Sequence, residues 1–337
     1  MGYIYKHFIK ENTAPKDSKK IGVYNSKGAR LCGIMQGNLA PTKSNKLYSF
    51  GIISDSHIME QESGYSGTYP SLKLETALTW FEEQGAKFVC HCGDITNHGF
   101  WNSDGTKDLT QFAEYKRICD LHPNLPVYAC CGNHDSYFGN ITETLTDLQE
   151  YTGHSLYYSI PYDNDLFIFI GQPAKTTAMN DTEYQWLTST LEANNGKRCF
   201  IFVHPFFSND SGNPKNTYET GVSLDSRPAL KTLLSQHNTM LFHGHSHFRF
   251  DCQEVEETAI YTDKNGFRSM HIPSITAPAI VNSSGSREQI STESYGFLVD
   301  VYNDCVVFNA RDFGIVSGNT MVNPKWLPIS TYKIDMA

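Results

Sequence analysis

Between residues 47 and 247, short apolar runs alternate with helical segments, and most of the runs end at a polar motif. The apolar runs have the length of buried strands and occupy 47–53, 88–92, 126–131, 166–170, 199–203 and 239–242. Helices are predicted between them within 71–85, 108–121, 181–194 and 226–237. For the first helix, Ser71 is expected to cap the start and Gly85 the end. Alternating strands and helices predict an α/β fold, whose ligand crevices lie beyond the carboxyl ends of the strands.

Five polar motifs follow one another along this alternating region. They are Asp55-Ser-His57, Gly93-Asp94, Gly132-Asn133-His134-Asp135, His204 and Gly244-His245-Ser246-His247. Residues i and i+2 of an extended segment share a face, so Asp55 and His57 can bind one ion, and the pair His245 and His247 is typical of metal chelation. The two oxygens of Asp94 can bridge two cations. The set predicts two adjacent divalent metal ions and one further histidine for proton transfer.

The remaining motifs carry less specific signals. Asn133 offers a neutral carbonyl oxygen as a ligand, whereas His134 points elsewhere and can pair with the carboxylate of Asp135. Taken alone, Gly-Asp is typical of a turn, and His204 is typical of a buried structural histidine. Chance is nevertheless a poor explanation for the whole set, because all five motifs occur in order and follow predicted strands.

Composition limits the partners of the chain. Its formal net charge of −9 argues against a long nucleic acid, because phosphate contacts need a surface of Lys and Arg. No apolar stretch is long enough for a membrane span, and no secretory signal is recognised. The nine Cys show no disulfide pattern and are expected to be mainly buried thiols, which predicts a reducing, cytoplasmic location. Cys90-His91-Cys92 is assigned to strand packing, because His91 faces opposite to the two cysteines.

The two ends of the chain differ from this alternating region. Residues 1–46 contain strand-like runs around a Gly-containing turn and then a linker. They are interpreted as a hairpin-like extension that either packs on the core or tethers the protein to an assembly, and residues 47–337 are assigned to one domain. After His247, strands are expected at 259–261, 267–272, 295–302 and 305–309, as a second sheet packed on the first. The polar stretch 282–293 is expected to be a mobile loop.

The motif set resembles the calcineurin-like metallophosphoesterase superfamily, whose pattern is Asp-x-His, Gly-Asp, Gly-Asn-His-Asp/Glu, His and Gly-His-x-His. The resemblance covers residues 47–250 and implies a four-layer α/β/β/α sandwich of two mixed β-sheets. It implies a first metal ion held by Asp55, His57, Asp94 and His247. It implies a second ion held by Asn133, His204, His245 and the shared Asp94. His134 corresponds to the catalytic histidine of the family, with Asp135 as the carboxylate that orients it.

The resemblance implies a hydrolase that cleaves a small phosphoester substrate with a dinuclear metal centre and a metal-bridging hydroxide. The Ser/Thr protein phosphatase branch extends Gly-Asp to Gly-Asp-x-x-Asp-Arg, whereas here the run is Gly93-Asp94-Ile-Thr-Asn97-His98. This departure favours the branch of small phosphodiesterases, with a nucleotide-like or headgroup-like substrate. A phosphomonoesterase and a non-catalytic binding or scaffold protein are the alternatives. Ligands of nitrogen and oxygen without sulfur suit Mn²⁺, Fe or Zn²⁺.

Signals for substrate contacts are weaker. The loops at 60–71 and 206–225 flank metal motifs and are expected to rim the site. Tyr65 and Tyr69 in the first loop could stack a base, although ordinary surface loops are the better explanation for them. His98 is a candidate contact for the substrate phosphate, and Arg287 is expected to lie in solvent.

Overall fold

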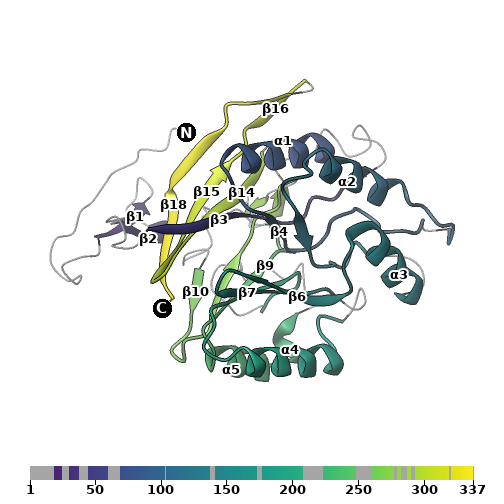
Figure 1. Cartoon of the computed structure of the whole chain (residues 1–337). Helices are drawn as coiled ribbons and strands as arrows, with labels where there is room; N and C mark the ends of the chain where they lie inside the picture. Colours follow the sequence, from purple (N-terminus) through teal and green to yellow (C-terminus); the bar gives the residue numbers. More distant parts are fainter. Residues whose placement is uncertain are drawn as a thin grey trace.

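Two six-stranded sheets form the centre of the computed structural model (Figure 1). In order of hydrogen-bonded neighbours, the first sheet consists of β18 (Lys325–Asp335), β15 (Cys305–Asp312), β14 (Tyr295–Tyr302), β3 (Lys46–Ile53), β4 (Val89–His91) and β5 (Val127–Ala129). The second consists of β10 (Ile260–Thr262), β11 (Arg268–His271), β9 (Thr239–His243), β8 (Cys199–Val203), β7 (Asp165–Ile170) and β6 (Tyr157–Tyr162). Both sheets are mixed: β3, β4 and β5 are parallel, as are β7, β8, β9 and β11, while the outer strands pair antiparallel.

Smaller elements complete the described part of the chain. Three two-stranded ribbons are formed by β1 (Lys19–Tyr24) with β2 (Arg30–Gly37), β12 (Ala279–Val281) with β13 (Arg287–Gln289), and β16 (Ile315–Ser317) with β17 (Thr320–Val322). The helices are α1 (Pro70–Glu83), α2 (Thr110–Asp120), α3 (Ile141–Thr152), α4 (Asp181–Ala193) and α5 (Ala229–Ser235), with a short 3-10 helix at Leu224–Ser226. The structure describes residues 19–24, 30–37, 45–59, 69–102, 104–136, 141–172, 177–207, 223–247, 260–276, 279–281, 287–289, 293–318 and 320–336. None of the helices within these ranges is both long and apolar enough to span a membrane.

Three apolar clusters hold the layers together. The cluster between the sheets is rich in aromatic rings from β3, β7, β8 and β9, including Phe50, Phe167, Phe169, Phe200, Phe202 and Phe242. Along β8, Phe200 and Phe202 face the other sheet while Ile201 faces the helices, because successive residues of a strand point to opposite faces. Each buried Phe contributes about 1.5–3 kcal/mol.

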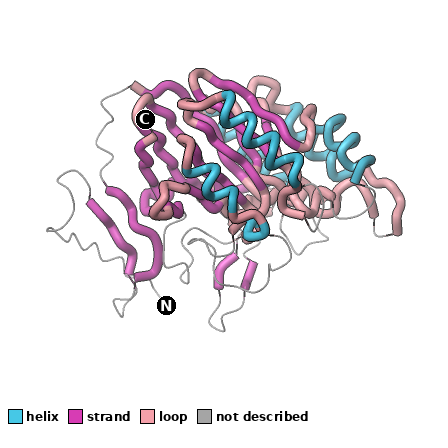
Figure 2. Tube along the Cα trace, turned by 90° about the horizontal axis from the view of Figure 1, so that it is seen from below, coloured by secondary structure: helices cyan, strands magenta, loops and turns pink. Residues whose placement is uncertain are grey.

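The outer faces of the two sheets are covered by helices, with α1 and α2 on one side and α4 and α5 on the other (Figure 1). Figure 2, seen from below, shows helices lying in front of the strands. Leu74, Leu78 and Phe81 of α1 pack on the first sheet, together with residues of α2. Residues Leu187 of α4 and Leu230 of α5 pack on the second. The layer order is therefore helix, sheet, sheet, helix, and the expected four-layer α/β/β/α sandwich is confirmed.

The expectation for the C-terminal strands is wrong in its pairing. They do not form a sheet of their own: β14 pairs antiparallel with β3, with Phe297 opposite Ile52, and extends the first sheet. β10 and β11 extend the second sheet, because β11 pairs parallel with β9. Periodicity identifies these strands but not their partners, and an open edge of each existing sheet accepts them.

Smaller differences concern the ends of elements. The helix α1 begins one residue before Ser71, because Pro70 occupies its first turn, where a missing N–H is tolerated, and Tyr69 is the N-cap. Gly85 follows the helix with φ of 73°, as expected of a residue that ends one. The predicted helix at 226–237 is confined to α5, which begins after Pro228. The stretch 282–293 contains β13 rather than only a loop, and α3 and β6 were not predicted.

Candidate metal centre and active site

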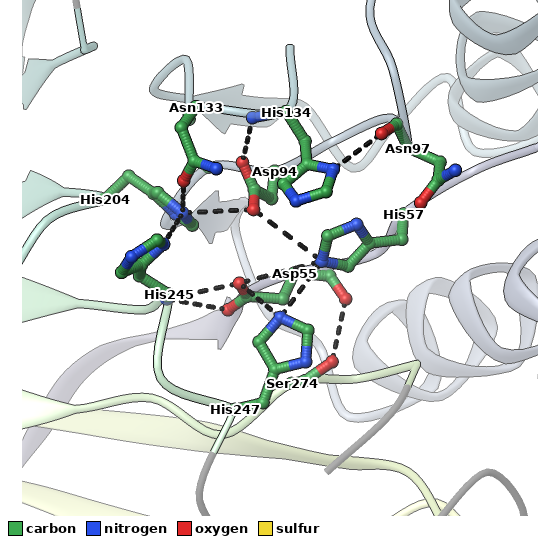
Figure 3. Close-up of polar contacts among 12 residues, drawn as sticks. Asp55, His57, Asp94, Asn97, Asn133, His134, His204, His245, His247 and Ser274 are labelled. Carbon is green, nitrogen blue, oxygen red and sulfur yellow. Dashed lines mark hydrogen bonds and ion pairs between the residues drawn. The ribbon is translucent and has the colours of Figure 1, made fainter. Parts of the chain in front are cut away.

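Each predicted metal ligand lies just beyond the carboxyl end of a strand. Asp55, Asp94 and Asn133 follow β3, β4 and β5 of the first sheet. His204 and His245 follow β8 and β9 of the second sheet. The side chains from both sheets therefore meet at one end of the sandwich, and Figure 3 shows them directed toward one another.

The first group consists of Asp55, His57, Asp94 and His247, whose ligand atoms all lie within 4.8 Å of one another. Nε2 of His247 lies 3.1 Å from Oδ1 of Asp55 and 3.0 Å from Nε2 of His57. Nε2 of His57 lies 3.7 Å from Oδ2 of Asp94. All four residues are buried. Two imidazoles and two carboxylates that converge on one point form a donor set suited to a divalent cation.

The second group consists of His204, His245 and the same Asp94, with Asn133 beside them. Nε2 of His204 lies 3.1 Å from three atoms: Oδ2 of Asp94, Nδ1 of His245 and Oδ1 of Asn133. One oxygen of Asp94, Oδ2, thus faces histidines of both groups. The structure brings together all seven side chains that the sequence singles out as ligands, in two groups that share one carboxylate.

The backbone of the cluster is unusual. Five of the seven residues have a left-handed backbone conformation: φ is 55° at Asp55, 45° at His57, 51° at Asp94, 70° at His245 and 59° at His247. Residues with a side chain rarely adopt this conformation, and each instance costs on the order of 1–3 kcal/mol and persists only where the surroundings enforce it. Such strain collects at functional sites, where side chains must be aimed at one point.

Two motif glycines are required because ligands pack against the backbone at these positions. A Cβ atom at Gly132 would lie 2.2 Å from Oδ1 of Asp94, and one at Gly93 would lie 2.8 Å from the ring of His204. Gly93 also has φ of 90°, which favours glycine. The glycines of the Gly-Asp and Gly-Asn-His motifs therefore allow two ligand loops to approach each other.

His134 lies beside the first group, with its ring 4.8 Å from that of His57. Its Nδ1 donates a hydrogen bond of 2.6 Å to the backbone carbonyl of Asn97, and its backbone N–H donates to Oδ1 of Asp94. A carbonyl oxygen can only accept, so the Nδ1 atom carries a proton. Sequence reasoning missed this contact, because a backbone carbonyl leaves no signal in the residue type.

The expected pairing of Asp135 with His134 is wrong. The buried carboxylate of Asp135 accepts hydrogen bonds from other groups, namely the backbone N–H of Ile95, Thr96 and Gly132 and the hydroxyl of Thr96. Burial, followed by the charge of Asp94, raises the pKa of Asp135 to about 6. Asp135 therefore joins the loops after β4 and β5 instead of orienting the histidine.

Ionisation in the cluster suits cation binding. Burial lowers the pKa of His57 well below its ordinary range and that of His245 to about 3, so both imidazoles are neutral, the form that ligates metals. Burial acts to raise the pKa of Asp94, but the neighbouring His204 outweighs it and holds the pKa well below the usual range. Burial acts to lower the pKa of His204, but the charge of Asp94 raises it to about 9, so a cation that binds here displaces a proton from His204. Charged carboxylates among closely spaced imidazoles, without sulfur, fit two cations of the Mn, Fe or Zn type.

Two further residues were not predicted and support the first ligand loop. The hydroxyl of Ser274 donates to the backbone carbonyl of Asp55, and that of Thr276 donates to the carbonyl of Ser56. Both follow the end of β11, so the rule that functional groups follow strand ends could have identified them.

Few of the proposed substrate contacts lie within the described residues. Nε2 of His98 lies 2.6 Å from Nε2 of the buried Gln111 on α2, so its ring contacts that helix. Tyr69 is the N-cap of α1. Tyr65, the side chain of Arg287 and most of the loop after Phe207 lie outside the described residues.

A comparison with protein families tests the chemistry that this geometry indicates. The family model described as calcineurin-like phosphoesterase matches residues 48–249, which include every ligand-type residue of the cluster. The chain belongs to the calcineurin-like phosphoesterase family. As a member of this family it is a phosphoester hydrolase, and its two donor groups support a dinuclear metal centre. A search of curated proteins found no significant match to this phosphoesterase.

Solved structures with this fold share little sequence with the phosphoesterase. A dimetal phosphatase from Danio rerio superposes with a TM-score of 0.59 at 14% identity, covering 87% of this chain and 100% of that one. A purple acid phosphatase from yellow lupin (Lupinus luteus) seeds gives 0.57 at 14% identity, covering 94% of this chain and 59% of that one. An anchor protein of the inner membrane complex of Plasmodium gives 0.51 at 12% identity, covering 84% and 89%. At such identities the likeness concerns the fold alone.

Proposed function

We propose that this phosphoesterase is a phosphodiesterase with two metal ions that acts on a small nucleotide-like or headgroup-like substrate. The observation that supports it is the convergence of two donor groups on Oδ2 of Asp94, beyond the ends of strands from both sheets. Two-metal sites of this kind are typical of enzymes that displace a group at phosphorus.

The proposed metal ligands follow the two donor groups. Residues Asp55, His57, Asp94 and His247 would hold one ion, and Asn133, His204, His245 and the shared Asp94 would hold the other. When bound, the two ions would neutralise charge on phosphate oxygens and activate water as a nucleophile. The chain itself holds the ligands in fixed positions, so that little reorganisation is needed during reaction.

His134 is proposed as the proton donor to the leaving oxygen. The bond from its Nδ1 to the carbonyl of Asn97 fixes the ring, so proton transfer would take place at Nε2. The bond from its backbone N–H to Asp94 ties the position of this ring to the shared carboxylate. General acid catalysis of this type contributes on the order of 10²–10⁴ in rate. Asp135 would act on His134 only indirectly, through the loop that it stabilises.

Charge near the cluster favours a diester over a monoester. At position 98, where the Ser/Thr protein phosphatase pattern has Arg, this chain has a histidine that contacts Gln111. A monoester carries more negative charge than a diester and gains more from a cationic clamp. The diester therefore suits this site better.

Two other functions have specific observations in their favour. The structures of the Danio rerio and yellow lupin proteins are described as phosphatases, which favours a phosphomonoesterase. The Plasmodium protein with this fold is described as an anchor, which favours a binding protein. One observation argues against a binding protein. This chain has every residue of both donor groups, and a protein that serves only as a scaffold does not need them.

One experiment separates the three functions. Metal content of the purified protein is measured together with Mn²⁺-dependent hydrolysis of bis-p-nitrophenyl phosphate and p-nitrophenyl phosphate. Two metals per chain and faster diester hydrolysis are expected. Faster monoester hydrolysis would favour the phosphomonoesterase, and no metal and no turnover after reconstitution would favour the binding protein.

The remaining proposals concern the setting of the enzyme. A cytoplasmic location is supported by the described cysteines, all of which are free thiols and most of which are buried. Residues 47–337 are proposed as the catalytic domain. The predicted strands of the N-terminal extension form the hairpin of β1 and β2, and β2 contacts β18, which favours a packed addition over a tether.

A further inference from the structure

We propose that two buried histidines outside the metal cluster, His91 and His271, are positioning residues that hold the ligand loops through Ser56 and Ser246. These serines are the central residues of the motifs Asp55-Ser-His57 and His245-Ser-His247. The inference rests on the proposed metal centre and assigns a role to residues that the family motifs leave open.

The first anchor joins the loops after β3 and β4. His91, the last residue of β4, is fully buried, and its Nε2 donates to the hydroxyl of Ser56 over 2.9 Å. The Ser56 hydroxyl donates in turn to the carbonyl of Ile95 over 2.8 Å. The backbone N–H of Gly93 donates to Nδ1 of His91 over 3.2 Å, which fixes the tautomer. Both polar atoms of this imidazole are therefore used to join the loop of Asp55 to the loop of Asp94.

The second anchor repeats this arrangement in the other sheet. His271 is the last residue of β11, and β11 lies beside β9, the strand that leads to the loop His245-Ser-His247. The hydroxyl of Ser246 lies 3.1 Å from Nδ1 and 3.2 Å from Nε2 of His271. Both residues are buried, with exposures of 1% and 2%. In each sheet, a histidine that ends a neighbouring strand contacts the serine between two ligands.

The backbone explains why such anchors are needed. In each motif the residues before and after the serine have positive φ, and the two ligands are directed into the cluster (Figure 3). A strained segment persists only where its surroundings enforce it. The serine is the central residue of each strained segment, and its hydroxyl instead contacts a buried histidine outside the cluster. Outer contacts that orient metal ligands typically change metal affinity by 10–100-fold when removed.

The two anchors predict different effects on Mn²⁺ affinity when each serine is replaced by alanine. Ser56 lies between two ligands of the same ion, Asp55 and His57, whereas Ser246 lies between His245 of one group and His247 of the other. Calorimetric titration of the metal-stripped full chain with Mn²⁺ measures both sites. We expect Ser56→Ala to weaken mainly one of two binding steps by about 10-fold, and Ser246→Ala to weaken both.

Histidine variants test whether each pair acts as a unit. His91→Leu and His271→Leu should weaken Mn²⁺ binding as the serine variants do, and His91→Gln, which can both donate and accept, should restore most of it. The double variant Ser56→Ala/His91→Leu should bind Mn²⁺ no more weakly than the worse single variant. Additive losses would show that His91 does not act through Ser56 and would overturn the proposal for that pair.

A matched control separates positioning from stability. His122 is a buried histidine that contacts Glu82 beside α1 and α2, away from the cluster. His122→Leu should lower the melting temperature and leave Mn²⁺ affinity unchanged. Anchor variants with wild-type Mn²⁺ affinity would overturn this inference alone. Wild-type protein that binds no Mn²⁺ would instead overturn the proposed metal centre and the inference with it.

Discussion

At the scale of single residues, Asp94 combines more constraints than any other ligand in the cluster. Its Oδ2 faces histidines of both donor groups, its Oδ1 accepts the N–H of His134, and Gly132 is needed to make room for it. Asp94→Ala should therefore release both metal ions and lower kcat/KM by about 10³-fold or more, since several kcal/mol of charge stabilisation is lost. Elemental analysis and kinetics on the same preparation check this. Retention of two metals would contradict the shared role.

His134 makes an opposite prediction, because its ring is held by the carbonyl of Asn97 and it belongs to neither donor group. His134→Ala should keep both metals and lose about 10²–10⁴ in rate on substrates with a poor leaving group. An aryl ester with an activated leaving group needs no acid and should lose much less. A comparison of the two substrates with one enzyme preparation measures the difference, and equal losses would argue against proton donation by His134.

The sequence predicts residues of this cluster well where the side chain itself carries the chemistry. All seven ligand-type residues come together, because the carboxyl ends of the parallel strands meet at one edge of each sheet. Prediction fails where backbone groups act, as with the carbonyl of Asn97 that replaces Asp135 as the partner of His134. A residue type does not report where its carbonyl points.

At the scale of elements, the helix α4 carries a buried carboxyl group. Glu183 closes a capping box with Asn180, and the residue is fully buried. Burial raises the pKa of Glu183 from its ordinary 4.5 to about 7. The folded state therefore binds the proton more tightly than the unfolded state, so stability should fall as pH rises from 4.5 to 7.

Glu183→Gln tests this element, because glutamine can still accept the N–H of Asn180. The free energy of unfolding of the wild type should decrease between pH 4.5 and 7 by up to about 3 kcal/mol more than that of the variant. Urea denaturation at several pH values measures the difference. Glu192→Gln, an exposed position on the same helix, is the control and should follow the wild type. Parallel pH profiles for Glu183→Gln and the wild type would contradict the prediction.

Elements are predictable from the sequence to the extent that their signals are local. The strand β8 has its predicted bounds because it is an uninterrupted apolar run. The strand that pairs with β14 cannot be predicted from neighbouring residues. Phe297 lies opposite Ile52, which is far away along the chain, and pairing with β3 depends on which sheet edge is open. The same limit explains why the C-terminal strands were assigned to a separate sheet.

At the scale of the whole molecule, one buried polar network joins the two sheets near the start of β8. Arg198 makes a bidentate ion pair with Asp165, with distances of 2.9 and 2.7 Å, and also donates to the backbone carbonyl of Tyr302 in β14. The hydroxyl of Tyr48 in β3 donates to the same carboxylate. Arg198 precedes β8 and His204 follows it, so this network and the metal cluster lie at opposite ends of one strand.

Arg198→Ala should lower the free energy of unfolding by about 3–5 kcal/mol, because it leaves the carboxylate of Asp165 buried without its partner. Restoring neutrality with Arg198→Met/Asp165→Leu should recover part of this loss, since an apolar pair avoids the unpaired charge. Lys116→Ala removes an exposed ion pair with Asp120 and should change stability by less than about 1 kcal/mol.

Urea denaturation measures the stability of all three variants, and calorimetry should find unchanged Mn²⁺ affinity in each folded variant. If Arg198→Ala weakened Mn²⁺ binding as strongly as Ser56→Ala, the two ends of the sandwich would be coupled, and local anchoring alone would not account for the geometry of the cluster.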